Sequence, residues 1–105
     1  MGTRSQRKGR GGELELVNIL RCNGISAEPG QAVSFGKTPD VIGIAGVHAE
    51  VKRVEKLNVL EAMQQAIRDA EKFKDGLPAV FHRRNRSPWL VTMTLEDWLK
   101  LYKGR

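Results

Sequence analysis

Hydrophobic residues recur at helical spacing in three parts of the chain, and these parts predict three helices. The first covers residues 11–23, where the apolar side chains fall three and four positions apart. The second covers about 58–74, and the glycine and proline that follow it are typical helix stop signals. The third closes the chain over 94–102, with Thr94 placed to cap it and Asp97 at the third helical position, as in a capping box.

Shorter stretches rich in β-branched and aromatic residues predict the strands. Residues 40–44 and 47–53 are joined by Ala45 and Gly46, so we expect them to form an antiparallel hairpin with a tight turn. The predicted order is helix, three strands, helix, two strands, helix. The remaining strands are a short irregular one within 25–37 and two regular ones at 78–82 and 89–92.

Length and composition are those of one globular domain spanning residues 1–105, with the first ten residues as a candidate flexible basic arm. No apolar stretch approaches the roughly 20 residues needed to cross a bilayer, so a soluble, cytoplasmic protein without membrane contact is expected. Cys22 is the single cysteine, which excludes an intramolecular disulfide and a metal site built from several thiolates.

The charge of the chain favours a polyanionic partner. Its formal net charge is +6 and its isoelectric point is about 9.9, and each phosphate that Lys or Arg neutralises releases counterions from a nucleic acid. Basic runs are also common as solvated surface, so charge alone does not decide the partner. The basic residues gather in two clusters, one with Arg4, Arg7, Lys8 and Arg10 and the other with Arg83, Arg84 and Arg86.

The candidate chemistry lies on the predicted hairpin, where Pro39-Asp40 precedes Glu50-Val51-Lys52. Alternate side chains of a strand face the same way, so Glu50 and Lys52 project together, and the hairpin brings Asp40 alongside. Two such carboxylates can hold Mg²⁺ or Mn²⁺, which would activate a water against a phosphodiester, and a nearby lysine can stabilise the developing negative charge. The same residues could instead form a cross-strand ion pair without any function.

The first predicted helix carries a further acidic candidate. Glu13 falls at the centre of the apolar arc formed by Leu16, Val17 and Leu20, whereas Glu15 points to the opposite side. A carboxylate that faces the core would be explained by a metal, or by a lysine and water network around one. The positive end of the helix dipole is the simpler alternative.

Three ordered segments carry a resemblance to a known family. RKGRGGELELVNILR, SFGKTPDVIGI and HAEVKR together resemble the archaeal-type Holliday-junction resolvases and their small phage-encoded relatives in the PD-(D/E)xK nuclease superfamily. The similarity spans Arg7 to Arg53, and the predicted element order matches the core of that superfamily. The resemblance implies an α/β, restriction-endonuclease-like fold with a central mixed β-sheet flanked by helices, and Mg²⁺-dependent hydrolysis of DNA phosphodiesters, with Mn²⁺ able to substitute.

The resemblance also assigns candidate site residues. Lys52 would be the catalytic lysine, and Gln65 resembles a glutamine near the active site of many members, although it could be an ordinary solvated residue. The metal ligands would be Glu13, Asp40, Glu50 and the carbonyl of Val51. The DNA contacts would come from Arg7, Lys8, Arg10, Ser34, Arg53, Arg83, Arg84 and Arg86. The residues interpreted as structural are His48 and His82, with Trp89 and Trp98 as core or dimer-interface anchors.

These residues lead to a hypothesis and two rivals. The hypothesis is a structure-selective endonuclease that cuts a four-way DNA junction as a homodimer, because two symmetric cuts call for two active sites. The first rival is a phage-type nuclease acting on flaps, ends or nicked duplex with the same catalytic residues. The second is a non-catalytic basic DNA-binding module, in which Asp40, Glu50 and Lys52 form surface ion pairs.

Overall fold

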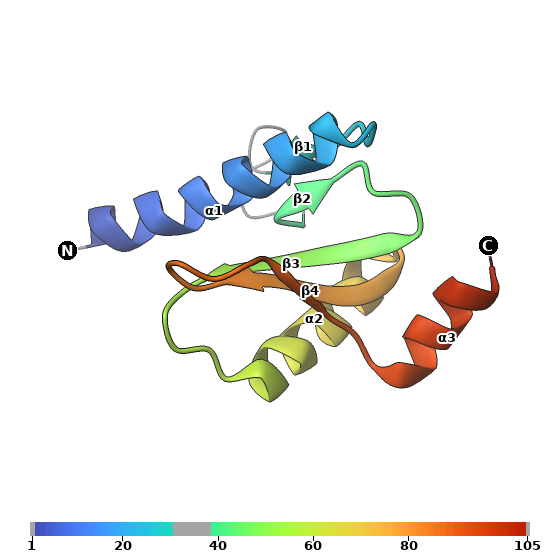
Figure 1. Cartoon of the computed structure of the whole chain (residues 1–105). Coiled ribbons are helices and arrows are strands. Elements are labelled where there is room, and N and C mark those ends of the chain that lie inside the picture. The colour runs from blue at the N-terminus through green and yellow to red at the C-terminus, as the bar shows by residue number, and fades with distance from the viewer. Residues whose placement is uncertain (1, 31–38, 105) are drawn as a thin grey trace.

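The computed structural model describes residues 2–30 and 39–104, with side chains for 11–30 and 39–104. These residues form three helices and one five-stranded sheet, and the helices lie around the sheet (Figure 1). The elements in chain order are α1 (Gly2–Cys22), β1 (Glu28–Pro29), β2 (Val41–Ile42), β3 (Val47–Arg53), α2 (Val59–Phe73), β4 (Leu77–Arg83), β5 (Leu90–Thr92) and α3 (Leu95–Lys103).

The sheet is mixed, and its strands follow the chain in the order β1-β2-β3-β4-β5. The pairs β1/β2, β2/β3 and β4/β5 are antiparallel, whereas β3 and β4 are parallel. Parallel neighbours need a crossover connection, and α2 supplies it. The predicted α/β fold with a central mixed sheet flanked by helices is therefore confirmed.

The predicted hairpin is confirmed, although β2 is shorter than the expected strand 40–44. Val41 pairs with Ala49, and the Val47 N–H donates to the carbonyl of Ile44 at 3.1 Å to close the turn. Gly46 has φ +80°, a conformation that glycine adopts without steric cost. The hairpin sets residue 40 against the middle of β3.

The two faces of the sheet carry separate apolar clusters. Helix α1 lies over one face of the sheet and α2 over the other (Figure 1). The α1 cluster includes Leu16 and Val17, and the α2 cluster includes Ala62, Met63 and Ala66. Strand β3 separates the two clusters, since its alternate side chains point to opposite faces. Ala49 and Val51 pack with the α1 cluster, so the side chains of positions 48, 50 and 52 face α2.

The start of α1 differs from the prediction. The helix begins at Gly2 and not at residue 11, so residues 2–10, expected as a flexible arm, continue the helix. Their side chains lie outside the described residues, and the DNA contacts expected from Arg7, Lys8 and Arg10 stay predictions. Further along, Gly12 allows close packing of α1 on β3, because a Cβ there would lie 2.6 Å from Cβ of Arg53.

The other two helices begin and end as predicted to within a residue or two. Asn58 caps α2 by accepting from the Glu61 N–H at 3.1 Å, and Lys74 closes it in the left-handed conformation. Thr94 caps α3 by accepting from the Asp97 N–H at 3.2 Å, which confirms the predicted cap. Among the residues that the structure describes, no helix combines the length and the hydrophobicity that a membrane span requires.

Candidate active site

Asp40 and Glu50 meet across the β2–β3 hairpin, as predicted from their spacing. Oδ2 of Asp40 accepts a hydrogen bond from the Val51 N–H at 3.0 Å, which fixes this carboxylate beside the strand. The Glu50 side chain is buried, with 5% of the residue exposed, and it lies close enough to interact with Asp40. Two carboxyl groups thus share one largely dehydrated space.

The electrostatics of this pair favour a bound cation. Burial, and next to it the negative charge of Glu50, raise the pKa of Asp40 to about 6, from the usual 3.8. The Val51 N–H and the charge of Lys52 act in the opposite direction and do not compensate. Two adjacent buried carboxylates with incomplete neutralisation are a donor set that fits a hard divalent ion such as Mg²⁺ or Mn²⁺.

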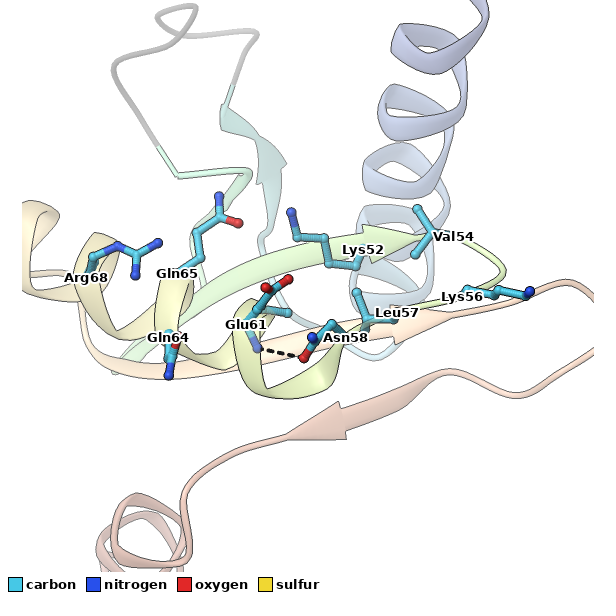
Figure 2. A pocket seen from close by; sticks show the side chains of 10 residues that line it. Lys52, Val54, Lys56, Leu57, Asn58, Glu61, Gln64, Gln65 and Arg68 are labelled. Atoms are coloured by element: carbon cyan, nitrogen blue, oxygen red, sulfur yellow. Dashed lines mark hydrogen bonds between the residues drawn. The ribbon is translucent and has the colours of Figure 1, made fainter.

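Lys52 lies beside the pair and opens onto a hollow. Its Nζ is 3.8 Å from Oε2 of Glu50, and its side chain is 29% exposed, so the charged end reaches solvent. The hollow has a volume of about 570 Å³ and lies between the end of β3 and α2. Figure 2 shows Lys52 and Gln65 pointing to the same side of it, whereas Gln64 points away.

Two further cations, Lys56 and Arg68, line this hollow together with Lys52 and were not among the site residues predicted from the sequence. The signal for Arg68 was available, because it lies three positions after Gln65 and helix residues at that spacing share a face. Lys56 lies in the loop between β3 and α2, where the sequence offers no periodicity. Together with Lys52 they give this hollow three basic side chains, against the one acidic side chain of Glu61.

His48 was interpreted as structural, and it lies next to the site. It is buried, with 1% exposed, and its Nδ1 is 2.9 Å from both carboxylate oxygens of Asp75. Its Nε2 faces Oε1 of Glu50 at 3.9 Å. Burial acts to lower the pKa of His48, but its interactions with Glu50 and Asp75 raise it overall. The alternation of positions 48, 50 and 52 was the sequence signal for this placement.

The other two predicted metal ligands are Glu13 and the Val51 carbonyl. Glu13 is buried, with 6% exposed, so the predicted inward direction of this carboxylate is confirmed. Its helix covers the face of β3 opposite to the Glu50 side chain. A ligand role for Glu13 stays a prediction, and so does one for the Val51 carbonyl.

Glu15 has a structural role that the sequence did not indicate, because the helical wheel placed it on the outer side of the helix. Its carboxylate accepts hydrogen bonds from Trp89 Nε1 at 2.8 Å and from Arg83, and it lies 3.9 Å from Nε of Arg53. Burial opposes the effect, but these partners lower the pKa of Glu15 below its ordinary value. Glu15 thus joins α1 to β3, β4 and the turn that follows.

Two of the arginines predicted to contact DNA, Arg53 and Arg83, have acidic partners within the protein. Both are partly buried, and their ion pairs with Glu15 and Glu55 give them a structural role. Arg84 and Arg86 are exposed in the turn between β4 and β5 and remain the better candidates there. Ser34 lies outside the described residues.

The second histidine and one tryptophan have clear structural contacts. His82 on β4 shares a 2.8 Å hydrogen bond with Thr92 on β5, and burial lowers the pKa of His82. Trp89 packs against the α1 cluster and donates to Glu15. Trp98 is 46% exposed on α3.

Comparison with known proteins gives a match in structure. No family model matches the chain, and no curated protein matches it in sequence. The structure is similar to that of Hjc, a Holliday junction resolvase from the archaeal hyperthermophile Archaeoglobus fulgidus. The TM-score is 0.59 at 22% identity, over 82% of this chain and 72% of that one. The chain therefore has the fold of an archaeal Holliday junction resolvase, as the motifs predicted.

Proposed function

We propose that this protein is a divalent-metal-dependent DNA endonuclease with Asp40, Glu50 and Lys52 at its active centre. The observation that carries the proposal is the buried contact of the Asp40 and Glu50 carboxyl groups beside the Nζ of Lys52. Surface ion pairs would not explain this arrangement, because Glu50 is buried and two carboxylates face one lysine. The fold shared with a resolvase supports the same conclusion.

Mg²⁺ is the proposed cofactor, with Mn²⁺ as a substitute. Asp40 and Glu50 would hold it, and Glu13 and the Val51 carbonyl are the further candidate ligands. Bound there, the ion would lower the pKa of a coordinated water and polarise the scissile phosphate. The ion would neutralise the negative charge of the two carboxylates, which the Val51 N–H and Lys52 compensate only in part.

The side chains around the metal site have separate roles in this proposal. Lys52 provides a compact positive charge that stabilises the negative charge developing on the phosphate. Gln65 lines the same hollow and is placed to orient water or a phosphate oxygen through its amide. Lys56 and Arg68 hold neighbouring phosphates of the DNA, which fixes the strand without reading its sequence.

A four-way junction is the proposed substrate, and the protein would act inside the cell. The support is the similarity to Hjc, which is itself a Holliday junction resolvase. Two coordinated cuts need two active sites, so the proposal includes a homodimer. Helix α3 is the candidate interface, because none of its side chains is buried within the described chain. Its exposed apolar residues are Leu95, Trp98, Leu99, Leu101 and Tyr102.

Cleavage of labelled DNA tests the proposal. The substrates are a four-way junction, a flap, a nicked duplex, linear duplex and single-stranded DNA, each with Mg²⁺, Mn²⁺ or EDTA. Wild type is compared with Glu50→Gln, and Glu71→Gln on the exposed side of α2 is the matched control. Paired symmetric nicks in the junction, lost with EDTA and in Glu50→Gln but kept in Glu71→Gln, are the expected result.

The other outcomes point to the rival functions. Cutting of flaps or nicked duplex in preference to the junction would keep the nuclease and replace the substrate. Binding of all DNAs without any cutting would overturn the proposed activity and favour a non-catalytic DNA-binding module.

A further inference from the structure

A second group of potential metal ligands adjoins the proposed site on the α2 side of β3. His48 and Glu50 on β3 and Asp69 on α2 each offer one ligand atom, and these atoms lie within 4.8 Å of one another. Asp40 does not belong to this group, and Glu50 is common to both. We propose that His48, Glu50 and Asp69 form a second cation site, selective for transition-metal ions, with Glu50 between the two ions.

The arrangement of His48 is the main support for a ligand role. Asp75 binds its Nδ1 at 2.9 Å, which fixes the ring and directs Nε2 toward Glu50. In the described residues, this buried Nε2 has no hydrogen-bond partner. Metal-binding histidines commonly donate a hydrogen bond from their second ring nitrogen to a carboxylate. This bond sets the tautomer and the direction of the ligating nitrogen. Asp75 is in the position of such a carboxylate.

Asp69 completes the group from the opposite element. It lies four positions after Gln65 on α2, and residues at that spacing share a helix face, so it is directed toward the same side of the sheet. Asp69 is partly exposed, which leaves a path from solvent to the site. Ligands around one ion at bonds of about 2.0 to 2.2 Å lie some 3 to 4 Å apart, so the observed spacing needs only a small contraction.

The donor set indicates which ions the site would take. One imidazole nitrogen with two carboxylates suits Mn²⁺, Co²⁺ or Zn²⁺, whereas Mg²⁺ prefers oxygen ligands only. The oxygen ligands proposed around Asp40 would therefore hold Mg²⁺ or Mn²⁺ without any nitrogen. This inference rests on the proposed function only because Glu50 belongs to both sites. Binding of a metal ion at His48 does not itself require DNA cleavage.

The competing arrangement is a protonated His48 that pairs with Asp75 and Glu50 and leaves no site for an ion. The two arrangements differ in a direct observable, the coupling of a nitrogen nucleus to a bound paramagnetic ion. Mn²⁺ bound through His48 Nε2 shows ¹⁴N coupling in pulsed electron paramagnetic resonance. Mn²⁺ held by Asp40 and Glu50 alone shows none.

The experiment titrates the metal-free protein with Mn²⁺ and records both the binding curve and the ¹⁴N coupling. The variants are His48→Gln and Asp69→Asn, with His82→Gln and Glu71→Gln as matched controls. Asp69→Asn keeps the size of a partly exposed side chain, so it reports on the site even if the buried His48→Gln fails to fold. Circular dichroism spectra verify that each variant is folded.

The expected result is ¹⁴N coupling in wild type and in both controls, its loss in His48→Gln, and at least about a tenfold weaker affinity at the nitrogen-coupled site in Asp69→Asn. Mn²⁺ binding without nitrogen coupling in wild type, or unchanged coupling and affinity in Asp69→Asn, would overturn the proposal. Asp40→Asn separates it from the nuclease function, because this variant is expected to lose cleavage and keep the ¹⁴N coupling.

Discussion

The Asp40 carboxylate accepts a hydrogen bond from the backbone N–H of Val51, with Oδ2 and N 3.0 Å apart. This one bond ties the residue before β2 to the strand that carries Glu50 and Lys52. It holds Asp40 against Glu50 although the two negative charges repel each other, as the raised pKa of Asp40 records. The fold therefore maintains an electrostatic conflict at the candidate metal site.

The first prediction concerns pH in the absence of metal. Because the folded state raises the pKa of Asp40 from 3.8 to about 6, this group supports folding below pH 4 and that support is lost as the pH rises through about 6. Replacing Asp40 by Asn removes the charge and can keep the bond from Val51. In EDTA at pH 7.5 we expect Asp40→Asn to have a higher melting temperature than wild type. The melting temperature should rise by about 4 to 8 °C for each kcal/mol of repulsion removed.

Calorimetry between pH 4 and pH 8 measures this difference, with Glu71→Gln as the exposed control. Adding Mg²⁺ at pH 7.5 is expected to stabilise wild type and to have little effect on Asp40→Asn, because the variant lacks a ligand. Stabilisation of Asp40→Asn by Mg²⁺ to the same extent as wild type, or equal stability of the two proteins in EDTA at every pH, would contradict the prediction.

Lys52 is predicted to act in the chemical step. Lys52→Met should lower the rate of junction cleavage by at least about a hundredfold, since it removes a charge that stabilises the transition state. DNA affinity should change little, because other cations also line the hollow. Single-turnover cleavage and gel-shift binding measure the two effects, and Lys72→Met on α2 is the control. If weaker DNA binding accounts for the whole decrease in cleavage rate, Lys52 has no role in the chemical step.

Glu15 is predicted to stabilise the fold. Its removal takes this acceptor from Trp89 Nε1 and from the partly buried Arg83. Arg53 also loses one of its two ionic partners. Glu15→Ala should therefore reduce the free energy of unfolding by about 1 to 3 kcal/mol. Glu15→Gln keeps an acceptor for Trp89 and should lose less. Urea denaturation followed by tryptophan fluorescence gives the values. Equal losses in both variants would exclude the Trp89 bond as the cause.

Arg84 and Arg86 are predicted to contact DNA phosphates. Replacing either by Ala should weaken DNA binding to a similar extent for every sequence and reduce the slope of log K against log salt by about 1. Binding measured between low and moderate salt tests this, with Lys103→Ala as a control of equal charge change. Unchanged slopes would show that these side chains are ordinary solvated surface.

The apolar surface of α3 is predicted to hold the homodimer. Trp98 stacks on Tyr102 with ring centroids 5.1 Å apart, and both rings are exposed. Trp98→Ala should shift the protein toward the monomer in sedimentation experiments, because buried aromatic residues contribute strongly to interfaces. Glu96→Gln on the same helix is the control. A wild type that sediments as a monomer at every concentration would refute the dimer.

The sequence by itself determined the local structure and the central motif. The period of the apolar residues predicted the helices, and turn residues such as Gly46 located the hairpin, because both signals depend on nearest neighbours along the chain. Strand alternation was enough to put Glu50 and Lys52 on one side of β3. The spacing of Asp40 from these residues then predicted the contact that the hairpin makes.

The tertiary structure decided what depends on distant segments. Glu15 finds Trp89 and Arg83 more than sixty residues away, and no helical wheel could indicate those partners. His48 and Asp69 come together because α2 crosses over β3 before it leads into β4. Side-chain chemistry at one position is local information, whereas the partner of a charged group is set by how the helices pack on the sheet.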